Sequence, residues 1–298
     1  MRRRTVVAGL GAGLLSGCAP DVVGRGPSDP IEGGIGGTGI VGLITDEARL
    51  LVNGRPLEVT PRTRLEAPVR LGQAVEVEAQ VRDGAVVASR LRDASPLVGR
   101  LVAGPVGLSV NGVAVRPEPD AIRGAAPGAR VAVSGLWRGD AVVAARLDPA
   151  TAGPDILAGV IEDGAVGGTP VRPPRWGRLP PSGTFARLAG RYEGGAFVAA
   201  EIERGRFPGL GGSLRRLSVE GYLEPRARAP GYALSGLGHS FDRGARLGPL
   251  AGTRAVIEGP YRGTFRASLG LPLPEGLARR RAVLADRPSV RALDLRRG

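Results

Sequence analysis

The sequence predicts an all-β protein with little helix. Of its 298 residues, 49 are glycine and 26 are proline, and both residue types oppose regular helix. No stretch free of both exceeds 11 residues, which excludes a helical bundle, a coiled coil and a transmembrane helix of roughly 20 apolar residues. Hydrophobic residues still make up 42% of the chain, more than a disordered chain carries. A strand-rich protein of several small domains is the class that remains.

Internal repetition divides this strand-rich chain into units. Val52-Asn53-Gly54 recurs 58 residues later as Val110-Asn111-Gly112. The segments at residues 71–77 and 83–91 recur at 127–133 and 139–147, and the second of them has a third copy at 194–202. A weaker fourth copy spans residues 259–269. A fixed period of this kind is the signature of tandem structural units.

Each unit predicts five short strands. In the first unit they span residues 40–45, 49–52, 56–60, 74–82 and 85–91. The Asn53-Gly54 pair joins the second and third as a hairpin turn, and Asn111-Gly112 does the same in the second unit, because both residues tolerate positive φ. Five strands with a longer connection between the third and fourth is the order of an OB-type barrel. The predicted fold is therefore three or four tandem small OB-like five-stranded barrels.

The repeat markers resemble domain-of-unknown-function family 5666, which occurs in exported bacterial proteins, often as tandem repeats. The resemblance is good over residues 39–92 and 98–148, fair over 156–203 and poor over 218–270. It implies no catalytic residues. The predicted organisation is a lipoprotein signal peptide (1–17), a flexible tether (18–38), OB-like repeats (39–95, 96–150 and 155–206), a divergent fourth repeat (214–272) and a basic tail (273–298).

The N-terminus predicts export and lipid anchoring. Three arginines precede an apolar stretch at residues 5–17, which is typical of a signal peptide. The stretch ends in Leu15-Ser16-Gly17-Cys18, which resembles the bacterial lipobox, so Cys18 is the predicted lipidation site. Because Ala19 rather than aspartate follows Cys18, we expect the periplasmic face of the outer membrane rather than the inner membrane. The choice between Sec and twin-arginine export stays open.

The basic charge does not itself indicate nucleic acid. All 41 basic residues are arginine, against 28 acidic residues, a pattern that a GC-rich genome produces. Only 11 residues are aromatic, and ten of them follow residue 170, so the first two repeats lack the stacking platforms of single-strand binders. Residues 276–287 predict a short helix, ended by Pro288, without an apolar stripe. We expect this basic tail to be attracted weakly to anionic surfaces and to be dispensable for folding.

Few residues are available for catalysis or metal binding. The chain has one histidine, His239, and one cysteine, so no zinc site, no catalytic residue and no cofactor is predicted. Glu76 and Glu78 alternate with apolar residues, which predicts that both carboxylates lie on the solvent face of a strand. A carboxylate-dependent periplasmic enzyme stays as the alternative function, and a single-strand nucleic-acid binder as the second alternative.

One segment has the composition of a binding loop. Arg172, Arg175, Trp176 and Arg178 stand among four prolines, which predicts a stiff basic loop with a stacking residue. Such a loop fits an anionic envelope component, a glycan or a lipid headgroup. The alternative is a proline-rich connector whose tryptophan caps the third barrel. The sequence thus predicts a lipid-anchored, non-enzymatic binding or scaffolding protein, and it identifies neither ligand nor protein partner.

Overall fold

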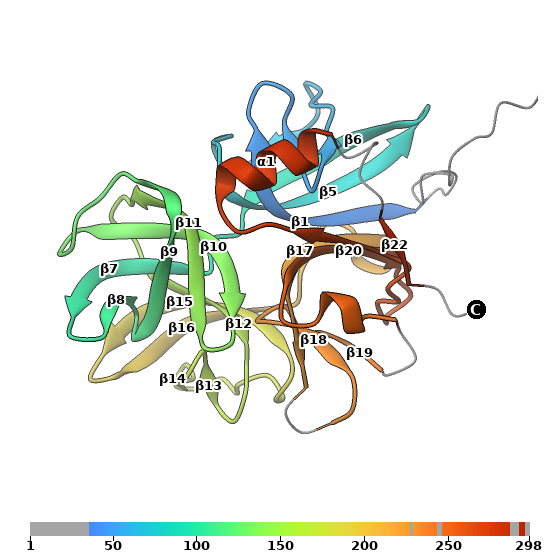
Figure 1. The fold of residues 1–298 in the computed structure, drawn as a ribbon. Helices are drawn as coiled ribbons and strands as arrows, with labels where there is room; N and C mark the ends of the chain where they lie inside the picture. The colour runs from blue at the N-terminus through green and yellow to red at the C-terminus, as the bar shows by residue number, and fades with distance from the viewer. Residues whose placement is uncertain (1–35, 227–228, 243–245, 287–291, 296–298) are drawn as a thin grey trace, which may run out of the picture. The chain divides into compact units, whose positions relative to one another are not determined.

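Strands dominate the computed structural model, which describes residues 36–226, 229–242, 246–286 and 292–295. Within those residues the one α-helix is α1 (Leu277–Ala285), and two 3₁₀ turns span Gly211–Ser213 and Gly248–Leu250 (Figure 1). No helix among these residues has the length and apolar character needed to cross a membrane. The all-β prediction, with small barrels and little helix, is confirmed.

The second repeat forms a closed barrel. Its strands are β7 (Leu97–Gly104), β8 (Gly107–Val110), β9 (Val113–Arg123), β10 (Arg130–Arg138) and β11 (Ala141–Pro149). They pair in the order β7-β8-β9-β11-β10, and β10 pairs back with β7 to close the barrel. All these pairings are antiparallel except β9 with β11, which is parallel. This is the strand order of an OB-type barrel.

The first repeat follows the same order with a shorter third strand. Its strands are β1 (Gly37–Asp46), β2 (Leu51–Val52), β3 (Arg55–Pro56), β4 (Arg64–Leu65), β5 (Ala74–Arg82) and β6 (Ala85–Asp93). Strand β1 pairs with β2 and β5, and β5 pairs with β6. The parallel bridge between Glu58 and Val87 stands where β9 pairs with β11 in the second repeat.

The third repeat keeps the neighbour relations without full closure. It contains β12 (Asp155–Val160), β13 (Ala165–Val166), β14 (Thr169–Arg172), β15 (Phe185–Glu193) and β16 (Ala196–Arg204). Its strands pair in the order β13-β14-β16-β15-β12. An isolated β-bridge between Glu162, which follows β12, and Ala165, in β13, links the two ends of that order.

In the fourth repeat, as in the second, the first strand pairs with the second and the fourth, and the fourth pairs with the fifth. It contains β17 (Leu214–Pro225), β18 (Tyr232–Leu234), β19 (His239–Phe241), β20 (Arg254–Pro260) and β21 (Leu269–Leu273). Strand β17 pairs with β18 and β20, β18 with β19, and β20 with β21. A short strand, β22 (Leu293–Asp294), extends the sheet beyond β21.

The repeats join in two pairs through their first strands. Strand β1 of the first repeat pairs in parallel with β17 of the fourth, and β7 of the second pairs antiparallel with β12 of the third. Two sheets result, one of the first and fourth repeats and one of the second and third. A unit of about 56 residues buries only about 60% of its unfolded surface, so this pairing supplies core that one repeat lacks.

The two asparagines hold these pairs together. Asn53, with a φ of 55°, donates from Nδ2 to the carbonyls of Val41 in β1 and Ser218 in β17. Asn111, with a φ of 53°, donates in the same way to Val98 in β7 and Ile156 in β12. Each asparagine therefore forms a hairpin turn and also ties its own first strand to that of the neighbouring repeat.

A glycine in each first strand makes room for the asparagine. A Cβ at Gly42 would lie 2.0 Å from Asn53 Oδ1, and one at Gly99 would lie 2.3 Å from Asn111 Oδ1, far inside van der Waals contact. The glycine of the first strand, in Val41-Gly42 and again in Val98-Gly99, and the asparagine of the Asn-Gly turn thus form one contact. The third repeat has Gly167 and Gly168 in this turn, with φ values of 53° and 77° that match the Asn-Gly pairs.

The prediction of a dispensable basic tail is wrong for the described part of residues 273–298. The predicted helix is present as α1, but Leu277, Arg280 and Leu284 are buried. Both carboxylate oxygens of Asp120, in β9, accept hydrogen bonds from the first helical N–H groups, those of Leu277 (2.9 Å) and Ala278 (2.7 Å). Desolvation opposes ionisation of Asp120, but these N–H groups hold its pKa below the ordinary value. The helix is therefore docked on the second repeat as part of the fold.

Candidate functional site

The predicted N-terminal sites lie outside the described residues. These are the signal peptide at residues 1–17, Cys18 and the tether as far as residue 35. The remaining candidates are the loop of the third repeat, the carboxylates of β5 and the single histidine.

The predicted binding loop is exposed on the surface. It connects β14 to β15, and Arg172, Arg175, Trp176 and Arg178 are all exposed, with Trp176 at 89%. The Arg175 guanidinium lies 5.1 Å from the centre of the Trp176 ring. This exposure rules out the alternative interpretation, in which Trp176 caps the third barrel.

The base of the same loop is anchored. Pro180 is buried, and Leu179 packs against the core shared by the second and third repeats. A turn bond from Gly177 N–H to the Pro174 carbonyl (2.8 Å) closes the tip. With four prolines limiting its backbone, the loop presents one large aromatic side chain and three guanidinium groups in a restrained segment.

The prediction that Glu76 and Glu78 face solvent is wrong, because both carboxylates are buried. The segment that joins the third and fourth repeats covers them: Glu76 accepts a hydrogen bond from Phe207 N–H, and Glu78 accepts one from Gly209 N–H, each at 2.9 Å. Arg92 donates to Glu76 at 2.8 Å, and Arg206 lies 3.4 Å from its other oxygen. The two carboxylates thus hold the connector on the first repeat.

His239 lies at the start of β19. Its ring contacts Phe265 edge to face at 5.3 Å between centroids, and its buried Nε2 has no hydrogen-bond partner among the described residues. Burial, with a smaller contribution from the positive charge of Arg206, lowers the pKa of His239 to about 4. The histidine is therefore neutral in the folded protein at neutral pH.

This lowered pKa predicts acid sensitivity. An unfolded histidine with a pKa of about 6.5 takes up a proton as the pH falls below that value, whereas folded His239 does so only near pH 4. Stability contributed by neutral His239 is complete above pH 6.5 and falls as the pH drops. Between pH 7 and pH 5 we expect a loss of about 2 kcal/mol from this group. Urea denaturation of the His239→Phe variant should show a shallower pH dependence by that amount, and an unchanged dependence would contradict the assignment.

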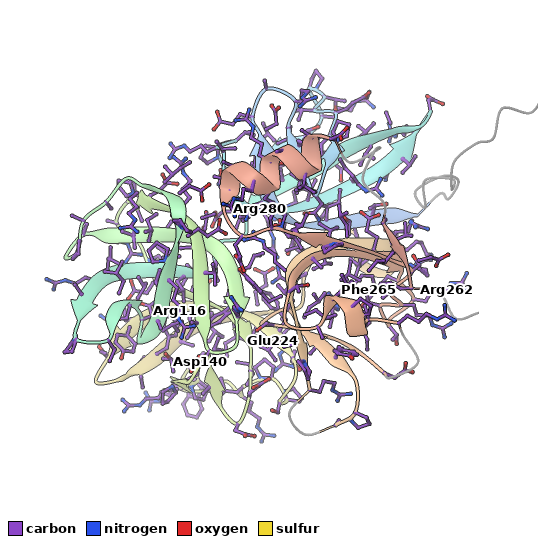
Figure 2. The ribbon with its side chains drawn as sticks, in the orientation of Figure 1. Arg116, Asp140, Glu224, Arg262, Phe265 and Arg280 are labelled. Carbon is purple, nitrogen blue, oxygen red and sulfur yellow. The ribbon has the colours of Figure 1, made fainter. Side chains whose placement is uncertain are left out.

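A second group of buried charges was not predicted from the sequence. Glu118 of β9, Glu220 of β17, Arg254 of β20 and Arg280 of α1 are each at most 1% exposed at the side chain. Arg280 points from α1 toward the strands (Figure 2) and lies 3.2 Å from Glu118 and 3.4 Å from Glu220. Arg254 contacts the same two carboxylates.

The same four charges connect three repeats and the helix. Glu220 also accepts a hydrogen bond from Leu43 N–H in β1 (2.9 Å). Burial opposes ionisation of Glu220, but Arg254 and Arg280 hold its pKa below the ordinary value. Two positive and two negative charges balance, so the group links these elements without leaving a net charge in the interior. Nothing in the hydrophobic periodicity signals it, because the four residues come from four different elements, and Arg280 is one of three consecutive arginines in α1.

No cluster of three or more potential metal ligands occurs among the described residues.

A search of curated proteins and a search of solved structures each found no significant match. Residues 38–92 match the family model described as Domain of unknown function (DUF5666). That range covers β1 to β6 apart from the terminal residues of β1 and β6, and it includes the Asn53-Gly54 turn. The chain therefore contains a DUF5666 domain of unknown function, formed by its first repeat.

Proposed function

We propose that this protein is a lipid-anchored protein of the bacterial cell envelope that binds an anionic envelope component without catalysing a reaction. The observation that carries the proposal is the loop between β14 and β15. There, Trp176 is 89% exposed and lies beside three exposed arginines. A large aromatic side chain next to guanidinium groups suits sugars and anionic headgroups, through stacking and charge-assisted hydrogen bonds.

The lipid anchor supplies the location in this proposal. The lipobox-like sequence ending at Cys18 supports acylation, and several acyl chains at about 0.8 kcal/mol per buried CH₂ give stable anchoring. The tether would then hold the four repeats near the periplasmic face of the membrane, with the outer membrane favoured by Ala19. Anionic lipid headgroups and glycans are abundant on such a surface.

The carboxylates of β5 favour binding over catalysis. A general acid or base must reach a substrate, whereas Glu76 and Glu78 are covered and engaged by backbone N–H groups. Glu203, another acidic residue on an alternating strand, pairs with Arg92 at 2.6 Å. These acids are engaged in ion pairs or hydrogen bonds within the fold. The basic loop is therefore the surface that we assign to ligand binding.

Binding to vesicles tests the proposal. In a full-length Cys18→Ser background, which removes the proposed acylation site, the protein should sediment with phosphatidylglycerol vesicles and not with phosphatidylcholine vesicles. Replacing Arg172, Arg175 and Arg178 with alanine should weaken this binding about 100-fold at low salt, since each basic residue near an anionic surface contributes about 1 kcal/mol. Trp176→Ala should weaken it further at salt concentrations that screen the arginines.

A charge-matched variant provides the control. Arg116, Arg262 and Arg279 are exposed on other elements, and replacing all three with alanine removes the same charge. Equal losses in the two triple variants would show that net charge, rather than the loop, drives the association. Wild-type protein that ignores anionic vesicles but binds a negatively charged glycan through the same loop would identify a glycan as the ligand.

A further inference from the structure

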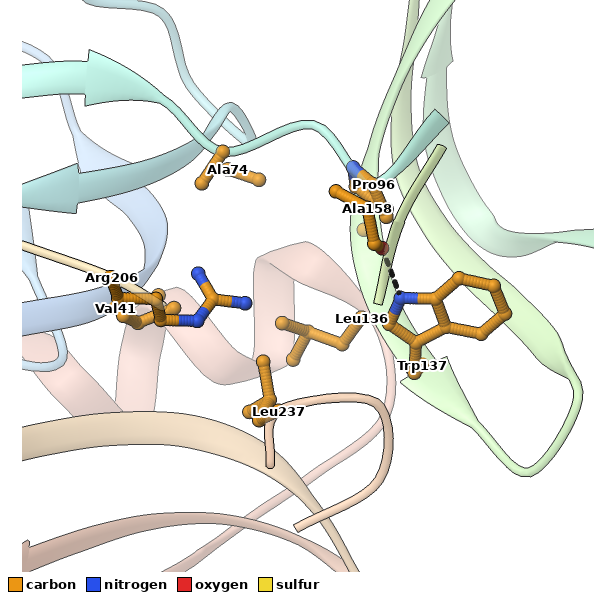
Figure 3. Close-up of a pocket in the computed structure, with 11 residues that line it drawn as sticks. Val41, Ala74, Pro96, Leu136, Trp137, Ala158, Arg206 and Leu237 are labelled. Carbon is orange, nitrogen blue, oxygen red and sulfur yellow. Dashed lines mark hydrogen bonds between the residues drawn. The ribbon is translucent and has the colours of Figure 1, made fainter. Parts of the chain in front are cut away.

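A small cavity lies where all four repeats meet. Its volume is about 20 Å³, room for one water-sized or slightly larger species. Most of its wall is apolar, and Figure 3 shows Ala74, Leu136 and Leu237 around it. All four repeats and the connectors between them contribute residues to the lining. These residues are Val41, Gly42, Ala74, Ala94, Pro96, Gly135, Leu136, Trp137, Ala158, Arg206 and Leu237.

Arg206 is the one charged residue in this lining. Its side chain is 11% exposed and its guanidinium points into the cavity (Figure 3). The Nε atom is buried without a hydrogen-bond partner among the described residues, and Nη1 reaches Glu76 at only 3.4 Å. The guanidinium carbon lies 3.6 Å from the centre of the Phe185 ring, which fixes its plane. Burial lowers the pKa of Arg206 to about 10, so the group stays charged at neutral pH.

The walls offer few acceptors to accompany this donor. Four carbonyls of the lining already accept hydrogen bonds. Val41 accepts one from Asn53 Nδ2, and Ala74 accepts one from Ala94 N–H. Pro96 accepts one from Ala158 N–H, and Ala158 accepts one from Trp137 Nε1. A buried water needs both donors and acceptors around it, whereas an anion needs donors and positive charge. An apolar wall with a single guanidinium suits a weakly hydrated, spherical anion.

We propose that this cavity binds one monovalent anion of about the size of chloride, held by the Arg206 guanidinium at the junction of the four repeats. Such an ion would add to the negative charge that Glu76 and Glu203 already place beside the guanidinium groups of Arg206, Arg187 and Arg92. This inference is independent of the proposed function, because it concerns the interior and not the surface loop.

Trp137 provides the readout, because it lines the cavity and bromide quenches tryptophan fluorescence by its heavy-atom effect. The full-length protein with Trp176→Phe has Trp137 as its only tryptophan. Titration with bromide at constant ionic strength, balanced with fluoride, should give a saturable decrease in fluorescence that chloride competes away. Linear quenching with no saturable component would overturn the proposal.

Variants then locate the anion. Arg206→Gln should weaken the saturable component at least tenfold, while Arg204→Gln, an exposed arginine two residues away, should leave it unchanged. Ala94→Leu should abolish it by filling the cavity while Arg206 is kept, and this variant decides the question if Arg206→Gln does not fold. Saturable quenching that persists in Ala94→Leu would place the anion elsewhere and refute the assignment.

Discussion

Replacing Arg280 with methionine is expected to lower the free energy of unfolding by about 3–5 kcal/mol. The Arg280 side chain is fully buried between Glu118 and Glu220, so its loss leaves two buried carboxylates with Arg254 as their remaining cation. Removing one partner from a buried ion group costs much more than the net stabilisation of the intact group, because an uncompensated charge stays in a medium of low dielectric constant. Chemical denaturation followed by circular dichroism measures the effect.

Arg279 provides the matched control for this prediction. It precedes Arg280 in α1 but is exposed, so Arg279→Met should change the stability by no more than about 0.5 kcal/mol. Adding Glu118→Gln to Arg280→Met should recover part of the loss by restoring charge balance. Similar small effects of Arg279→Met and Arg280→Met would mean that α1 is a surface tail after all.

Trp137→Ala is expected to cost about 3–5 kcal/mol of stability, the range for truncating a buried aromatic residue. The indole of Trp137 donates to the Ala158 carbonyl at 2.9 Å and lies against glycines of two other repeats. A Cβ at Gly167 of the third repeat or at Gly236 of the fourth would lie 2.3 Å or 2.1 Å from its atoms. Truncation therefore opens a cavity among three repeats at once.

The other tryptophan is the control, because Trp176 is exposed and Trp176→Ala should leave the melting temperature nearly unchanged. Trp137→Phe keeps most of the apolar contact and removes only the N–H donor, so we expect an intermediate loss. A Trp137→Ala variant as stable as Trp176→Ala would contradict the packing at the junction.

The sequence predicted the strands and turns of the repeats because those depend on local rules. Alternation of apolar residues and the Asn-Gly pairs specify strands and a hairpin within one unit. How the units pair depends on single side chains with no local signature. The backbone of Asn53 forms the hairpin turn, whereas its side chain bonds to β17. Only the turn can be predicted from the sequence.

The same distinction explains the errors. Alternation in β5 indicates one buried face and says nothing of a connector 131 residues away that covers the other, as the hydrogen bond from Gly209 N–H to Glu78 does. Likewise, a helix with three consecutive arginines has no apolar stripe, yet Arg280 is buried because Glu118 and Glu220 neutralise it. The exposed basic loop was predicted from composition, since its arginines, tryptophan and prolines lie within one short segment of the chain.

Hydrogen exchange, measured by mass spectrometry with and without phosphatidylglycerol vesicles, tests the central claim that the loop between β14 and β15 is the binding surface. For the full-length Cys18→Ser protein, we predict that peptides covering residues 172–178 gain protection when the vesicles are added. Peptides of β5, which carry Glu76 and Glu78, and of α1 should exchange at the same rate in both conditions. Protection gained on β5 or on α1, with none at residues 172–178, would contradict the account.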